Sequence, residues 1–111
     1  MTTIFSRIIN RELPAEIVFE NERIIVIKDL HPVAPVHLLI ISKKEIPSLQ
    51  KLKSEDLPLL AEMVCIVQEL AQQFGIAEGY RLLTNNGESS GQTILHLHFH
   101  LIGGRRLGAL A

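Results

Sequence analysis

The sequence predicts an α+β domain with a five-stranded antiparallel sheet, one short N-terminal helix and one long helix. Five β-rich runs are joined mostly by short polar connections, which favour antiparallel neighbours. Only the stretch between the third and fourth runs is long enough for a crossover, and it contains the long helical pattern. A chain of 111 residues can bury a core as one domain without disulfides or a structural metal, so we expect a single domain over residues 1–111.

The first element is predicted to be a short amphipathic helix. Ile4, Phe5, Ile8 and Ile9 recur at helical spacing behind threonines that can cap the helix, and the pattern ends before Pro14. Apolar side chains in such a stripe normally face the core, so we expect the first three of them to be core residues.

Three strands are expected next. Residues 17–19 and 23–28 are β-rich runs separated by three polar residues, which predicts a hairpin. Pro32 and Pro35 block both helix formation and ladder pairing, so they predict a rigid loop. This loop leads into a third strand over residues 37–42.

The long helix is expected to begin at Ser54, whose hydroxyl can cap it, and to end at Gly75. Cys65 lies within its apolar pattern and is expected to be a buried core residue. Two further strands are predicted over residues 80–85 and 94–102.

Composition excludes several classes of protein. The 11 basic and 12 acidic residues are scattered, so no basic stripe can follow a nucleic-acid polymer. No apolar stretch approaches the ~18 residues that a membrane span requires, and the charged N-terminus lacks the apolar core of a signal peptide. A single cysteine cannot form an internal disulfide. We therefore expect a cytoplasmic protein that binds neither membranes nor nucleic-acid polymers.

Three of the five histidines alternate with apolar residues in the last predicted strand. Successive side chains of a strand point to opposite faces, so His96, His98 and His100 are expected to face one way. The side chains expected on the other face are Leu95, Leu97, Phe99 and Leu101.

Three interpretations of the histidines remain open. The first is a solvated polar strand face. The second is a metal site, although the Cα atoms of His96 and His100 should be about 13 Å apart at ~3.3 Å per residue, which disfavours all three histidines on one zinc ion and leaves a pair with His37. The third is nucleophilic catalysis at phosphorus, because a neutral imidazole can attack without a separate base while its neighbours donate hydrogen bonds to the charged oxygens.

The polar loop over residues 86–93 favours the third interpretation. Its glycines allow close backbone approach to a phosphate, and its N–H groups can donate to one. Gln92 and Thr93 add polar side chains directly before the first histidine of the triple.

Residues 96–102 read His-Leu-His-Phe-His-Leu-Ile, which fits the signature of the histidine triad (HIT) superfamily. The flanking glycine segments resemble its histidine triad nucleotide-binding (Hint) branch. The resemblance covers nearly the whole chain. It includes residues 3–9, 13–15, 34–37, 79–81, 91–93 and 103–105, together with Asp29, Pro32, Lys43, Lys44 and Asn85.

This resemblance implies a hydrolase of purine nucleoside phosphoramidates that works in two steps without a metal or cofactor. In the family the middle histidine, here His98, attacks the α-phosphorus and forms a nucleotidyl-histidine intermediate. His100 matches a phosphate-contacting histidine, and His96 with His37 matches the pair that orients the nucleophile and relays protons. Asp29 matches the carboxylate that accepts hydrogen bonds from the ribose hydroxyls.

The resemblance also implies the partners and the remaining site residues. The partners are a purine nucleotide (AMP, GMP or their phosphoramidates) and a second copy of the chain in a homodimer. The other expected nucleotide-binding residues are Asn85, Gly91, Gln92 and Thr93 around the ribose and phosphate, and Ile4, Phe5, Ile8 and Ile27 as apolar walls around the base.

Alternatives stay open for the function and for single residues. The chain could instead be a nucleotide-binding or interaction module with little turnover, or a histidine-rich zinc-binding protein. Asp29 could simply cap the turn before Pro32, His37 could be a satisfied core histidine, and Asn85 could be a strand-end turn residue.

Overall fold

All five predicted strands pair in one antiparallel sheet, with the strand order β1-β2-β3-β5-β4. The computed structural model describes residues 2–110. The strands are β1 (Ile17–Glu20), β2 (Ile24–Lys28), β3 (Val36–Ser42), β4 (Tyr80–Leu83) and β5 (His98–Gly103). The α+β class and the antiparallel sheet are therefore as predicted.

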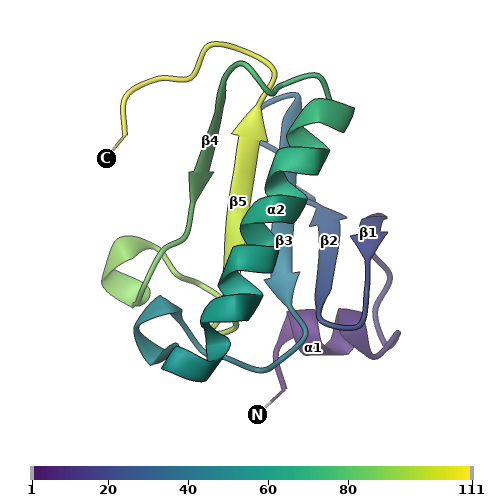
Figure 1. Ribbon diagram of the computed structural model, residues 1–111, viewed down its shortest axis with the longest axis vertical. Coiled ribbons are helices and arrows are strands. Elements are labelled where there is room, and N and C mark those ends of the chain that lie inside the picture. The colour runs from purple at the N-terminus through teal and green to yellow at the C-terminus, as the bar shows by residue number, and fades with distance from the viewer. Residues whose placement is uncertain (1, 111) are drawn as a thin grey trace.

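Two α-helices accompany the sheet (Figure 1). The short helix α1 (Ile4–Ile9) begins at Thr3, whose side chain accepts from the backbone N–H of Ser6 in a capping box. The long helix α2 (Leu57–Gln73) lies across the sheet and links β3 to β4. Short 3-10 helices cover Leu49–Lys51, Ser54–Asp56 and Glu88–Ser90.

Central strand β3 separates two apolar clusters. Leu38 and Ile40 belong to the cluster under α2, whereas Leu39 and Ile41 belong to the cluster that contains α1. This alternation explains why β3 reads as a continuous apolar run, because both of its faces are covered. Burial of each such side chain stabilises the fold by about 1.5–3 kcal/mol.

Two burial predictions are wrong. Cys65 is exposed, because the buried stripe of α2 follows Met63, Ile66, Val67 and Leu70 at helical spacing and leaves Cys65 on another face. Ile4 was expected in the core but is 51% exposed, since α1 packs on the sheet through other side chains.

The last two predicted strands are shorter than expected. Strand β4 ends at Leu83, after which the Thr84 hydroxyl donates to the carbonyl of His98. Strand β5 begins only at His98. The preceding segment turns, because the N–H of Leu97 donates to the carbonyl of Ile46 over 2.7 Å instead of joining the ladder of β5.

This turn overturns two orientation predictions. His96 lies outside the strand, so the three imidazoles do not form one regular strand face. Leu95, expected on one face with Leu97, Phe99 and Leu101, is 59% exposed, whereas Leu101 is buried in the cluster under α2 and Leu97 is also buried.

The long helical segment also begins differently. A 3-10 turn comes first, and the Asp56 carboxylate, not the Ser54 hydroxyl, accepts the backbone N–H of Lys53 over 3.0 Å.

Within residues 2–110, no helix is both long and apolar enough to cross a membrane.

Candidate active site

His98 is held with one ring nitrogen fixed. Its Nδ1–H donates to the carbonyl of His96 over 2.7 Å, because a carbonyl can only accept. A neutral His98 therefore keeps its lone pair on Nε2, which has no hydrogen-bond partner among the residues that the structure describes. Burial lowers the pKa of His98, and the bond to the His96 carbonyl only partly opposes this effect. The ring is thus neutral near pH 7 and has an available lone pair on Nε2.

His96 is buried and bonded at both ring nitrogens. Its Nε2–H donates to the carbonyl of Ser42 over 2.6 Å, and the Thr3 hydroxyl donates to its Nδ1 over 3.0 Å. No nitrogen of this ring is left to exchange protons with a substrate. The geometry therefore fits the orienting half of the role expected for His96, because its carbonyl holds His98.

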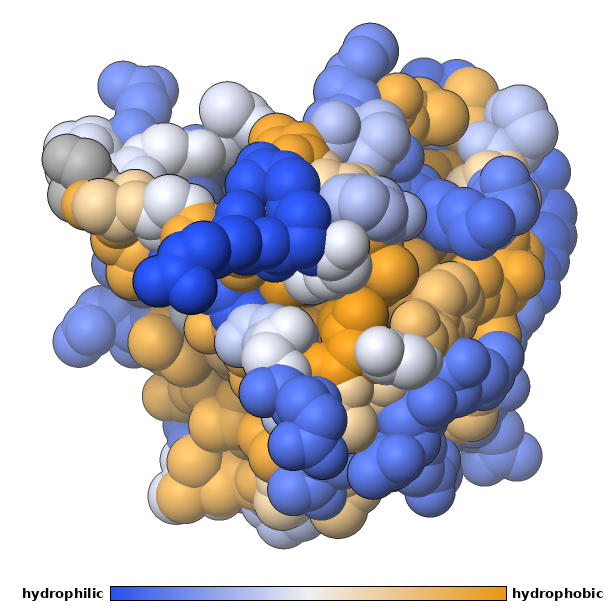
Figure 2. Space-filling view, turned by 90° about the horizontal axis from the view of Figure 1, so that it is seen from above, coloured by the Kyte–Doolittle hydropathy of each residue, from blue (hydrophilic) through white to orange (hydrophobic). Residues whose placement is uncertain are grey.

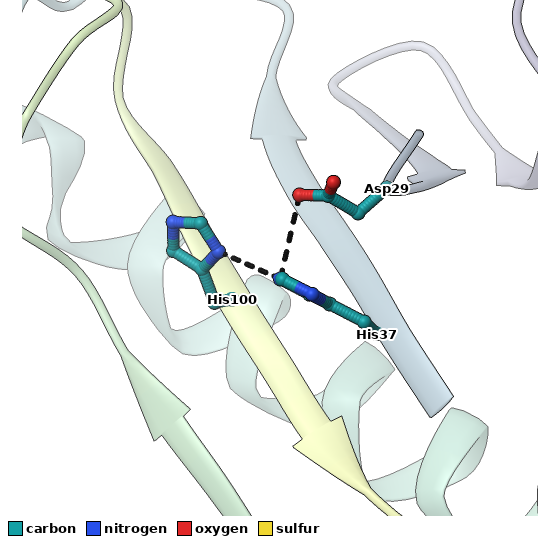
Figure 3. Close-up of side chains that lie close together, drawn as sticks. All are labelled: Asp29, His37 and His100. Carbon is teal, nitrogen blue, oxygen red and sulfur yellow. Dashed lines mark hydrogen bonds and ion pairs between the residues drawn. The ribbon is translucent and has the colours of Figure 1, made fainter. Parts of the chain in front are cut away.

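His100, the last histidine of the triad, meets two side chains from other segments, Asp29 and His37 (Figure 3). Asp29 follows β2, His37 belongs to β3 and His100 to β5. His37 Nε2 lies 2.9 Å from His100 Nδ1 and 3.4 Å from Asp29 Oδ2. The register of β3 and β5 creates this contact, because it pairs His37 with Ile102 and Leu39 with His100 and so puts the two histidines on one face.

The hydrogen bonds assign the protons on these rings. The backbone N–H of Val33 donates to His37 Nδ1 over 3.2 Å, so neutral His37 carries its proton on Nε2. That proton is donated to His100 Nδ1, which leaves the His100 proton on Nε2.

Burial keeps both rings neutral. Burial lowers the pKa of His37, with Asp29 opposing, and burial together with neighbouring histidines lowers the pKa of His100 to about 4. A neutral His100 offers one N–H donor beside His98, since the two ring centroids are 5.3 Å apart.

Phe5 links the apolar cluster of α1 to His98. Its ring meets His98 edge to face, with centroids 4.8 Å apart, and meets His96 at 5.9 Å. Ile8 and Ile27 are buried in the same cluster as Phe5. Of the four expected apolar walls, only Ile4 is mostly exposed.

The loop before β5 is held by Gln92. This side chain is 5% exposed, accepts from the N–H of Gly87, and donates to the carbonyls of Pro47 and Ile94. Both of its polar ends are engaged, so Gln92 organises the loop instead of offering a free amide to a nucleotide.

The other expected loop residues lie at the surface of this loop. Gly91 is left-handed with φ 104°, a conformation that glycine adopts without strain, and its α-carbon faces the Asn85 side chain. Thr93 is exposed. A cavity of about 230 Å³ is lined by Thr3, Glu45, Pro47, Leu95 and, of the three histidines, His96.

One group of donor atoms has the spacing of a metal site. Single ligand atoms of Asp29, His37 and His100 all lie within 4.8 Å of one another. His96 and His98 are not part of this group, so the predicted alternative of two triad histidines with His37 is not the one that forms. The His37–His100 hydrogen bond accounts for the same closeness without an ion.

Several residues that shape the site were not predicted from the sequence. From the sequence, Thr3 is predicted only as one of two threonines that can cap the first helix, and Thr84 lies within the predicted fourth strand. The carbonyl of Ser42 and the N–H of Val33 act through the backbone, so no residue type could have identified them.

Comparisons with known proteins agree with this geometry. A family model described as scavenger mRNA decapping enzyme C-term binding matches residues 2–108. A HIT-like protein of Chlamydia pneumoniae is 56% identical over 109 residues, 98% of this chain and 99% of the relative. The purine nucleoside phosphoramidase of Escherichia coli (strain K12) is 42% identical over 109 residues, 97% of this chain and 92% of the relative.

Solved structures of HIT family proteins also resemble this chain over nearly its whole length. A HIT family hydrolase from Clostridium thermocellum superposes with a TM-score of 0.94 at 44% identity, covering 98% of this chain and 96% of that one. A HIT family hydrolase from Legionella pneumophila also has a TM-score of 0.94, at 41% identity and 96% coverage of both chains. The fold, the matched length and the histidine arrangement together establish that this chain belongs to the histidine triad (HIT) family.

Proposed function

We propose that this protein is a nucleotide hydrolase of the HIT family, and more specifically a purine nucleoside phosphoramidase. One observation carries the proposal: the Nδ1–H of His98 is tied to the carbonyl of His96, so the free lone pair lies on Nε2 of a half-buried ring with a lowered pKa. The similarity to a purine nucleoside phosphoramidase over nearly the whole chain supports the substrate class.

The reaction would proceed in two displacements. His98 Nε2 forms a bond to the α-phosphorus while the bond from phosphorus to the amine nitrogen breaks, and the leaving nitrogen takes one proton from solvent. Water then attacks the phosphorus, the phosphorus–Nε2 bond breaks, and one proton of the water returns to solvent, which releases the nucleoside monophosphate and restores neutral His98. We propose that His100, whose Nδ1 is occupied by His37, donates its Nε2–H to a phosphoryl oxygen, where charge accumulates in each step.

Asp29 is proposed to bind the ribose. Its Oδ1 accepts the N–H of His31 over 2.8 Å, so it also caps the local turn. A carboxylate has about four lone-pair positions, which leaves acceptor capacity for hydroxyl groups of a nucleoside. Asn85, Gly91 and Thr93 are proposed to lie near the ribose and phosphate, and Phe5, Ile8 and Ile27 behind the base.

We also propose that two copies of the chain form a homodimer through β4 and α2. Strand β4 is an edge of the sheet, so one side of its backbone is unpaired. On the same side of the fold, a groove is lined partly by Cys65, Ala77 and Tyr80. Exposed apolar side chains of α2 include Leu57 and Val64. Sedimentation at micromolar concentration should give twice the 12.4 kDa mass of one chain, and a monomer mass would refute the dimer.

A trapping experiment tests the catalytic proposal. The protein is mixed with an adenosine phosphoramidate, quenched within the first turnovers, digested and analysed by mass spectrometry. We expect an adenylate on the peptide that contains His98, together with steady release of the amine. Binding of AMP without an adduct or amine release would favour an interaction module, the alternative class.

Chelation distinguishes the metal alternative. The proposed steps use only side chains and water, so hydrolysis should be unchanged after dialysis against a strong chelator. Loss of hydrolysis on chelation, restored by zinc, would instead support a metal site at Asp29, His37 and His100.

A further inference from the structure

Arg105 reaches across the end of the molecule to the loop between β2 and β3. Its Nη2 donates to the carbonyl of Val33 over 2.7 Å, and its Nη1 donates to the carbonyl of Arg106 over 2.8 Å. Figure 2 views this end, where strongly hydrophilic side chains form one group across the centre of the face. Arg105 has no carboxylate partner within the part of the chain described. Its guanidinium therefore binds backbone carbonyls, and that of Val33 is the one distant in the chain.

A close backbone approach beside Arg105 reinforces the contact. Gly104 lies against Pro35, and a β-carbon at this position would come within 3.0 Å of the Pro35 ring. Gly104 also has φ +96°, a conformation that favours glycine. The segment after β5 is therefore pressed onto the proline-containing loop at two successive residues.

Val33 is consequently held at both of its peptide groups. Its carbonyl accepts from Arg105, and its N–H donates to His37 Nδ1. Val33 is itself 56% exposed, so little packing of its side chain would keep the N–H aimed at the ring. A guanidinium that fixes the carbonyl restricts the rotation of the residue between the two hydrogen bonds.

We propose that Arg105 is a positioning residue that, through Val33, keeps His37 in the form that donates Nε2–H to His100. The chain of contacts runs from Arg105 to the Val33 carbonyl, from the Val33 N–H to His37 Nδ1, and from His37 Nε2–H to His100 Nδ1. Its end is the Nε2–H of His100, which faces the phosphate under the proposed function. Arg105 itself touches no reacting atom.

The proposal predicts a specific electrostatic effect. Protonation of His37 would put a proton on Nδ1, which would then face the Val33 N–H, so this contact favours the neutral ring. Asp29 favours the charged form of His37, while charge on His100 would disfavour it. Weakening the contact between the Val33 N–H and His37 should therefore make protonation of His37 easier.

The test compares Arg105→Ala with Arg106→Ala in the full chain. Both variants remove one positive charge at adjacent exposed positions, but only Arg105 contacts Val33. Histidine ring resonances are titrated by NMR, and hydrogen exchange of the Val33 amide is measured. In Arg105→Ala we expect the pKa of His37 to rise by roughly half a pH unit or more and the Val33 amide to exchange several-fold faster. Arg106→Ala should match the wild type.

Two further results complete the test. Arg105→Lys keeps a donor and should recover part of both effects. In turnover, Arg105→Ala should lower kcat more than it raises KM, because the phosphate donor is affected and the ribose contact is not. An unchanged His37 titration in Arg105→Ala, or an equal shift in Arg106→Ala, would overturn the proposal. The NMR readouts need no substrate, so they stand even if the proposed hydrolysis fails.

Discussion

The hydroxyl of Thr3 donates to Nδ1 of His96 over 3.0 Å, although 93 positions separate these residues in the chain. The same hydroxyl oxygen accepts the N–H of Ser6 and so caps α1. One side chain therefore begins the first helix and fixes the first histidine of the triad. Folding of the N-terminus and formation of the site are coupled through this atom.

Replacing Thr3 should therefore disturb both features. Thr3→Val keeps the shape but removes the cap and leaves His96 Nδ1 unsatisfied, which should lower the free energy of unfolding by about 1–3 kcal/mol. Thr3→Ser keeps the hydroxyl and should stay close to the wild type. Urea denaturation measures both variants, and equal stability of Thr3→Val and Thr3→Ser would show that the hydroxyl contributes nothing.

Removing the proposed nucleophile should separate turnover from binding. His98→Ala eliminates the covalent step, so kcat for a nucleoside phosphoramidate should fall by roughly three orders of magnitude or more. Affinity for AMP, measured by calorimetry, should change much less. Activity of His98→Ala near the wild-type level would exclude the proposed intermediate.

The pH dependence of turnover follows from the lowered pKa of His98. The nucleophile must be neutral, and its pKa lies below the ordinary value of 6.5. Turnover should therefore remain high as pH falls through 6.5 and decline only at lower pH. A profile of kcat/KM against pH, with ionic strength held constant, measures this limb. A midpoint at or above 6.5 would contradict the burial argument.

Stability should fall over a related range of pH. The pKa of His100 is about 4 in the folded protein against 6.5 for an ordinary histidine, so the unfolded chain binds more protons between these values. The contribution of His100 to the free energy of unfolding is complete above about pH 6.5 and is lost as pH drops toward 4. His100→Gln should flatten the dependence of the free energy of unfolding on pH in this window. Exposed His31 supplies the control, and His31→Gln should leave the slope unchanged.

Gln92 should act on the loop and not as a direct ligand. Gln92→Ala removes hydrogen bonds to Gly87, Pro47 and Ile94 together, so we expect a loss of about 1–3 kcal/mol in stability and a raised KM. Thr93→Ala alters an exposed neighbour and should leave stability within about 0.5 kcal/mol. A normal melting temperature for Gln92→Ala would refute the role of Gln92 in organising the loop before β5.

The sequence by itself determined the α+β class, the five strands, the two α-helices and the three histidines as the centre of interest. These features depend on periodicity and on turn residues, which are local properties of the chain. It also marked His37, both as a possible metal ligand and through the resemblance to a family, and it marked Asp29 through that resemblance alone. Local patterns could not show that Cys65 faces outward, because the choice of buried stripe on α2 depends on which face meets the sheet.

Tertiary structure alone decided how the histidines divide their roles. His96 lies outside the strand because the N–H of the next residue, Leu97, donates to the carbonyl of Ile46. The ring of His96 is then bonded to the Thr3 hydroxyl and the Ser42 carbonyl. The protons on His37 and His100 depend on hydrogen bonds between segments that are distant in the chain, one of them from a backbone N–H. Backbone donors look alike in every sequence, and which one meets a ring is fixed only when the strands and loops have packed.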